Sequence, residues 1–184
     1  MAAAPRLMTV DEYVRTPETV LPAEIAFGVL RVADAPTPRH QHAVAQLFLS
    51  LNAHVRPRGL GRIWLSPLDV ILDESKALVV QPDLMFISRD REHIVQDRVR
   101  GAPDLVIEVL SPSPRIGRTE EHLRWFAEYG VRECWLLHQD NKSLDIVEFA
   151  HRKTGARRSI ASDQIIASRV LPEFSARLTD ILEA

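Results

Sequence analysis

A glutamate inside an apolar segment is the residue of this chain whose position points most directly to chemistry. Glu108 lies within residues 105–110, where all the remaining side chains are Leu, Val or Ile. A Ser-Pro-Ser-Pro sequence follows this segment. β-Branched residues bounded by turn formers predict a buried strand. An ionised carboxylate in such a strand costs on the order of 3–5 kcal/mol unless a cation, a set of hydrogen bonds or a proton compensates it.

A second acid has a similar setting upstream. Asp83 follows Gln81 and Pro82 and precedes the apolar residues 84–87. If the two strands are neighbours, the carboxylates of Asp83 and Glu108 lie close together. Mg²⁺ binds one or two carboxylates and keeps waters for substrate phosphates, and such an ion can activate water for attack on a phosphodiester. The pair therefore predicts a divalent-metal site, with internal neutralisation by arginines or backbone N–H groups as the alternative.

Two other patterns are weaker candidates for a metal site. His40 and His42 lie two positions apart at the start of a predicted helix, where their side chains do not face each other, which argues against shared zinc. Asp104 lies four residues before Glu108 on the same face of the strand, roughly 13 Å away at about 3.3 Å per residue. That separation is too long for one shared ion, so Asp104 is predicted to be a strand-edge or turn acid.

The elements that must position these acids follow from hydrophobic patterning and capping residues. Strands are expected at residues 24–32 with a break at Gly28, 78–88, 103–110 and 131–137, and one or two strands at residues 63–73 around Pro67. Residues 143–149 and 158–161 are expected to form a later hairpin around Thr154 and Gly155. Helices are expected at residues 9–15, from Pro38 to about Val55 behind a Thr37 cap, and behind Thr119 up to Gly130. This order predicts one α/β (α+β) domain over residues 1–184, with a mixed sheet flanked by helices.

Composition limits the class of protein but does not identify a ligand. The 184 residues carry 46% hydrophobic side chains and a formal net charge of −2, so there is no overall basic signature for nucleic acid, although a local basic cleft is not excluded. Cys134 is the only cysteine, and no apolar stretch has the length of a signal peptide or membrane helix. A cytoplasmic protein without a membrane segment is therefore expected.

Three segments give the chain a resemblance to a known family. They are Gln81-Pro82-Asp83-Leu84 and the segments at residues 101–113 and 127–135. Together they look like the Uma-type putative restriction endonucleases, bacterial proteins assigned to the PD-(D/E)XK nuclease superfamily. The resemblance covers about residues 24–149 and includes the histidine-bearing start of the first long helix.

The resemblance implies a restriction-endonuclease-like core that acts on DNA, in which Asp83 and Glu108 hold Mg²⁺ or Mn²⁺. The usual lysine two residues after the second acid is replaced by Leu110. In this family the lysine typically lies on the following helix, and His122 occupies that position here. A histidine can shuttle a proton or orient water, but it lacks the constant positive charge of lysine.

Further residues are expected beside this site by the same resemblance. They are Glu24, His40 and Gln81. The family's Gly-Glu pair near the N-terminus is altered to Gly28-Val29, so Glu24 is the acid expected nearby, and an acid four residues before the lysine position is replaced by Arg118.

Three functions remain open at the level of sequence. The leading hypothesis is a metal-dependent DNA endonuclease in which Asp83 and Glu108 bind the ion and His122 replaces the lysine. The second is a catalytically inactive nucleic-acid- or protein-binding module on the same fold, because both lysine positions have lost lysine. The third is a structural homodimer whose buried acids are satisfied internally. A homodimer also suits a restriction-type nuclease, since two active sites match two strands.

Overall fold

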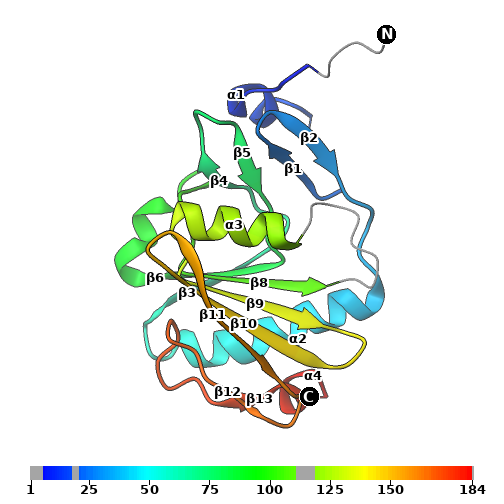
Figure 1. The fold of residues 1–184 in the computed structure, drawn as a ribbon, viewed down its shortest axis with the longest axis vertical. Coiled ribbons are helices and arrows are strands. Elements are labelled where there is room, and N and C mark those ends of the chain that lie inside the picture. The colour runs from blue at the N-terminus through cyan, green and yellow to red at the C-terminus, as the bar shows by residue number, and fades with distance from the viewer. Residues whose placement is uncertain (1–5, 18–20, 111–118, 184) are drawn as a thin grey trace.

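The computed structural model describes residues 6–17, 21–110 and 119–183, which form two main sheets packed with helices (Figure 1). The described helices are α1 (Val10–Val14), α2 (Pro38–Val55), α3 (Thr119–Tyr129) and α4 (Leu178–Leu182), with a 3-10 helix, η1, at Arg89–Ile94. A small additional sheet pairs β12 (Ile165–Ile166) with β13 (Ala176–Arg177).

The first sheet has the strand order β2-β1-β5-β4-β7. Its strands are β1 (Ala23–Ala26), β2 (Val29–Val32), β4 (Val70–Asp73), β5 (Leu78–Val80) and β7 (Val99–Arg100). The turn between β1 and β2 consists of Phe27 and Gly28, both with positive φ (52° and 84°), as a tight primed hairpin turn requires. A Cβ atom on Gly28 would lie 3.0 Å from Leu7 Cβ, so glycine suits this position for space as well as conformation.

The second sheet, called the core sheet below, has the order β11-β10-β9-β8-β6-β3. Its strands are β3 (Gly61–Leu65), β6 (Leu84–Ser88), β8 (Leu105–Leu110), β9 (Glu133–His138), β10 (Ser143–Ala150) and β11 (Lys153–Ile160). β8 and β9 run parallel, whereas the other neighbouring pairs are antiparallel, so this sheet is mixed.

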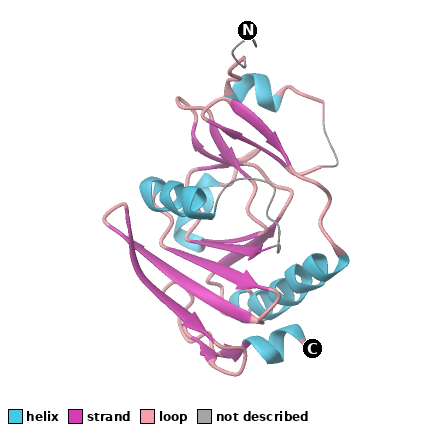
Figure 2. Ribbon diagram, turned by 45° about the vertical axis from the view of Figure 1, so that its right-hand side comes forward, coloured by secondary structure: helices cyan, strands magenta, loops and turns pink. Residues whose placement is uncertain are grey.

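Helices cover both faces of the core sheet (Figure 2). The apolar side of α2, including Leu47 and Leu51, packs in one cluster with Ile107 and its neighbours on the same face of the sheet. Side chains of α3 pack in a second cluster with Val106. Because side chains alternate along a strand, Glu108 shares the α3 face with Val106, as the sequence pattern indicated.

The long helix α2 follows from local signals at its N-terminus. Thr37 is the N-cap, and its hydroxyl accepts a hydrogen bond from the His40 backbone N–H at 3.2 Å. Pro38 occupies the first helical position, where a missing N–H costs nothing. The predicted bounds of this helix, and the prediction of mixed β structure flanked by helices, are confirmed.

Some predicted elements were wrong in detail. Residues 78–88 are not one strand: they divide into β5 and β6, which belong to different sheets. Thr119 is the first residue of α3 rather than its cap, and the hairpin of β10 and β11 turns at His151 and Arg152 rather than at Thr154 and Gly155.

Candidate functional site

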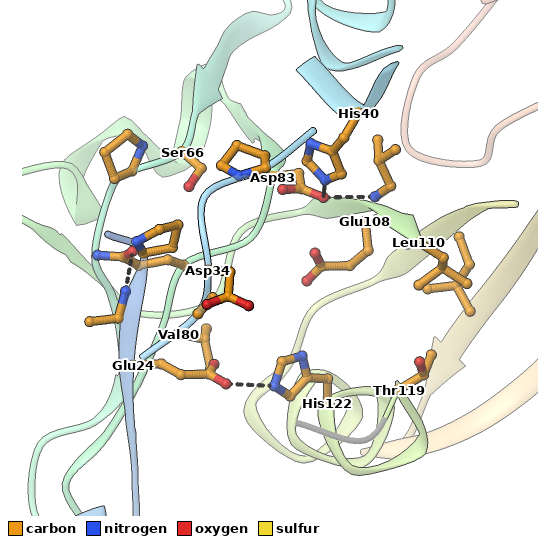
Figure 3. Close-up of a pocket in the computed structure, with 18 of the residues that line it drawn as sticks. Glu24, Asp34, His40, Ser66, Val80, Asp83, Glu108, Leu110, Thr119 and His122 are labelled. Atoms are coloured by element: carbon orange, nitrogen blue, oxygen red, sulfur yellow. Dashed lines mark hydrogen bonds and ion pairs between the residues drawn. The ribbon is translucent and has the colours of Figure 1, made fainter. Parts of the chain in front are cut away.

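A cavity of about 460 Å³ lies where the first sheet meets the core sheet, α3 and the start of α2. Four carboxyl side chains line it, and Figure 3 shows them around the same space: Glu24, Asp34, Asp83 and Glu108. Two histidines also line it, one from each long helix. Among the described residues that line the cavity there is no lysine or arginine, so the carboxyl groups dominate its electrostatics.

Asp83 is fixed by two hydrogen bonds to a single carboxylate oxygen. Its Oδ2 accepts from the Val109 backbone N–H at 2.8 Å and lies 3.1 Å from His40 Nε2. The hydrogen bond to Asp83 raises the pKa of His40, although burial opposes this effect. Asp83 comes directly before β6, which pairs with β8, so the sheet brings Asp83 beside the strand of Glu108.

Glu108 projects from β8 into the cavity (Figure 3). No side chain of residues 6–17, 21–110 or 119–183 forms a hydrogen bond or ion pair with its carboxyl group. Burial raises the pKa of Glu108 well above its usual value, and the negative charges of Asp83 and Glu24 raise it further. Burial and the neighbouring carboxylates thus disfavour the ionised form of Glu108, which a bound cation would favour.

Glu24 and His122 form a pair across the cavity from Asp83 (Figure 3). Glu24, which is only 4% exposed on β1, places Oε1 3.2 Å from His122 Nε2 on α3. The His122 ring also packs against Trp125, with ring centroids 5.2 Å apart. Because β1 and α3 belong to different layers, this contact depends on their packing.

Gln81 holds the strand that carries Glu24. Its Oε1 accepts from the Ala23 backbone N–H at 3.0 Å, and its Nε2 donates to Asp69 Oδ1 at 2.8 Å. The side-chain amide thus fixes β1 against the end of β5. The structure therefore brings together all the residues that the sequence placed at or beside the site: Glu24, His40, Gln81, Asp83, Glu108 and His122.

The other residues that the sequence analysis considered do not contribute polar groups to this cavity in the described part of the chain. Leu110 lines the cavity with an apolar side chain, and Arg118 lies outside the described residues. Asp104 is a turn acid away from the cavity, where it accepts from the Ser88 backbone N–H at 2.8 Å and from Arg91 at 3.1 Å. His42 lies 3.2 Å from the Leu182 carbonyl oxygen and does not join His40.

Sequence reasoning missed Asp34, which lines the cavity from the connection between β2 and α2. Its neighbours are Ala33, Ala35 and Pro36, so no apolar strand or helical pattern marks it as buried or functional. Only the path of the connection past the cavity brings it there (Figure 3).

Comparison with known proteins identifies the family of the chain and agrees with its fold. A family model named Uma2, described as "Putative restriction endonuclease", matches residues 10–179. The chain belongs to the Uma2 family. No curated protein matches the chain.

A solved structure is similar to this Uma2 protein over nearly its whole length. It is the crystal structure of a putative nuclease belonging to DUF820 from Anabaena variabilis, with a TM-score of 0.80 and 18% sequence identity. The match covers 96% of this chain and 98% of that chain. At this identity the likeness establishes the shared fold. None of the helices in the described part of this Uma2 protein is long and apolar enough to span a membrane.

Proposed function

We propose that this protein is a metal-dependent endonuclease that hydrolyses phosphodiester bonds in DNA. One observation carries the proposal: the half-buried Glu108 lines a cavity beside two further carboxyl groups, Asp83 and Glu24, without a cationic partner among the described residues. Membership of a family described as "Putative restriction endonuclease" supports the proposal of a nucleic-acid substrate. The buried single cysteine suits a reducing compartment, so we expect the protein to act in the cytoplasm.

The donor set fits a hard divalent cation. Asp83 and Glu108 would hold Mg²⁺ or Mn²⁺ through carboxylate oxygens, which are the ligands these ions prefer. No group of three or more His, Cys, Asp or Glu side chains in the described residues is arranged to enclose one ion. Two carboxylates with open positions match an ion that keeps waters and binds substrate phosphate. When bound, the ion would activate water and stabilise negative charge on the phosphodiester.

The protein's own groups would orient this chemistry. His40 and the Val109 N–H hold one oxygen of Asp83, which leaves the other oxygen free of these two donors. Fixing a ligand in this way lowers the cost of ordering it when an ion binds.

His122 would move a proton in place of the missing lysine. Its Nε2 faces Glu24, and a carboxylate that holds one ring nitrogen selects the tautomer and orientation of the imidazole. The other ring nitrogen is then available to orient or deprotonate the attacking water. Glu24 would act by positioning His122 rather than by contacting the substrate.

A second function is favoured by one specific observation. Leu110 and His122 replace lysine at both positions where the family resemblance places it, which is expected of a binding module that has lost catalysis. Such a module would bind nucleic acid or protein on the same fold without turnover. The two proposals differ in one measurable property, which is metal-dependent cleavage.

The test is nicking of supercoiled plasmid with Mn²⁺, with Mg²⁺ and with EDTA. We expect wild-type protein to nick DNA only with a divalent ion, and Glu108→Gln to lose about 100-fold or more of this activity, because even outer-shell changes at metal sites cost 10–100-fold. Glu128→Gln is the matched control, since it removes the same charge from an exposed position on α3.

Each remaining outcome has a distinct meaning. Full activity in Glu108→Gln would show that the site is wrongly assigned. An inactive wild type with activity gained in His122→Lys would identify a nuclease scaffold that has lost its lysine. An inactive wild type and an inactive His122→Lys would favour the binding module, and DNA binding unaffected by EDTA would strengthen that conclusion.

A further inference from the structure

Exposed apolar side chains are concentrated at one end of the molecule. Among the described residues, six of the nine large hydrophobic side chains that are exposed lie within residues 7–32. These six are Leu7, Leu21, Phe27, Val29, Leu30 and Val32. Apolar surface gathered in one region usually marks a site of association.

Three of these residues belong to β2, the outermost strand of the first sheet (Figure 1). The tight turn pairs Ala26 with Val29, and the Ala33 N–H donates to the Pro22 carbonyl at 2.9 Å beyond the other end of the hairpin. Main-chain groups alternate in direction along a strand, so those of Leu30 and Val32 point away from β1. Within the described residues, β2 has no partner strand on that side.

The single charged residue of β2 does not protect this edge. Natural edge strands are usually shielded by exposed charges, proline or bulges. The Arg31 guanidinium instead turns toward α3, where it lies 2.9 Å from Glu121 and 5.6 Å from the centre of the Trp125 ring. The outward edge is therefore left with apolar side chains: Leu30 is 45% exposed and Val32 is 51% exposed.

We propose that β2 pairs antiparallel with β2 of a second copy of this chain. A two-fold axis at Arg31 sets Leu30 opposite the partner subunit's Val32, and Val32 opposite the partner subunit's Leu30. In this register the outward main-chain groups of both residues exchange hydrogen bonds, and apolar side chains meet apolar side chains.

An identical strand suits this edge better than an unrelated one for a geometric reason. The two outward residues lie two positions apart and are both apolar, so the same short sequence, reversed, supplies a complementary edge. Pairing of this kind is isologous and closes at two copies, which also removes the exposed edge. In both subunits, Arg31 keeps its ion pair with Glu121 on α3 of the same subunit. The proposal does not depend on nuclease activity.

The first test is the mass of the protein in solution, measured by sedimentation from about 1 μM to about 100 μM. We expect a dimer for wild-type protein and a monomer for Leu30→Glu, because this substitution would bury a charge against the partner subunit's Val32. Leu49→Glu is the matched control, since Leu49 is 59% exposed on α2, and it should remain dimeric. A monomeric wild type, or a dimer unaffected by Leu30→Glu, would overturn the proposal.

The second test reads the register by oxidative cross-linking and does not require a disruptive substitution. Opposite residues of a hydrogen-bonded antiparallel pair have Cα atoms about 5.5 Å apart, which a disulfide can span. Native Cys134 is fully buried, so little cross-linking through this cysteine is expected. We expect a covalent dimer from the double variant Leu30→Cys with Val32→Cys, and none from Leu49→Cys. A covalent dimer from Leu30→Cys alone would overturn the proposed register.

Discussion

Glu108 and Glu133 lie on neighbouring parallel strands of the core sheet, but different groups surround their carboxyl oxygens. Glu133 is fully buried and accepts hydrogen bonds from Trp135 Nε1 at 2.6 Å, Ser168 Oγ at 2.7 Å and the Arg169 N–H at 3.0 Å. Glu108 faces other carboxyl groups across a cavity. A buried acid on a strand is therefore an ambiguous sign, and the donors around it decide whether it stabilises the fold or serves a site.

Asp104 belongs with Glu133 in this comparison. Its side chain is fully buried, and Ser88 and Arg91 supply its donors. Burial by itself raises the pKa of Asp104, but the Ser88 N–H and the Arg91 guanidinium outweigh burial, so the net pKa lies below the usual value. The pKa of Glu108 is shifted in the opposite direction, because burial and like charges act together there.

The largest expected effect is a difference in the free energy of unfolding between variants of Glu133 and Glu108. Glu133→Ala should lower the free energy of unfolding by about 3–5 kcal/mol, because it leaves the buried Trp135 N–H without an acceptor and opens a cavity. Glu108→Ala should change it far less, since no side-chain donor among the described residues loses its partner. Urea denaturation of both variants checks this. Equal losses would remove the distinction between the two acids.

An intermediate effect is expected from the ion itself. Mg²⁺ at about 100 times its Kd should stabilise metal-free wild-type protein by about 2.7 kcal/mol, as for any ligand that binds only the native state. Glu108→Gln and Asp83→Asn should lose this gain. Glu128→Gln should keep it, because Glu128 lies outside the cavity. Thermal unfolding with EDTA and with Mg²⁺ measures the difference, and a gain retained in Glu108→Gln would contradict metal binding at this acid.

The smallest expected effect is in the pH dependence of stability without metal. The folded-state pKa of Glu108 is raised above its usual 4.5, so its contribution to stability is present below pH 4.5 and lost as pH rises through the raised pKa. Glu108→Gln should therefore be about 1–2 kcal/mol more stable than wild type at neutral pH in EDTA.

Asp104 should give the opposite slope. Its folded-state pKa is lowered from 3.8, so its contribution is present above pH 3.8 and lost as pH falls through the lowered pKa. In Asp104→Asn, the free energy of unfolding measured by urea denaturation should accordingly fall less steeply as the pH is lowered. If the variant lost stability at low pH as steeply as wild type, the assignment of Asp104 as a stabilising anion would be contradicted.

Local signals made part of this structure predictable. The helix Pro38–Val55 has a cap, a proline at its first position and an apolar face, which agree with one another. The strand of Glu108 is a short apolar segment with clear boundaries, so the side chains that share its face could also be predicted. The proximity of Asp83 to β8 followed once both strands were placed in one sheet.

Other features depended on packing that no local pattern records. β5 and β6 are both apolar and only three residues apart, so the sequence reads as one strand although the chain crosses between sheets at residues 81–83. β12 and β13 are too short to show periodicity, and the segment between them is held by Glu133 through Ser168 and Arg169. Asp34 reaches the cavity from an irregular connection, and such positions depend on tertiary structure alone.

The pairing of Glu24 with His122 has a consequence for biosynthesis. Glu24 belongs to a hairpin near the N-terminus, whereas Glu108 and His122 follow all the strands of the first sheet. A ribosome adding about 5–20 residues per second therefore exposes Glu24 several seconds before its partner exists. The acidic cavity arises only when both sheets and α3 have docked. The ion site proposed above is therefore completed only at this packing step, and a partly synthesised chain does not contain it.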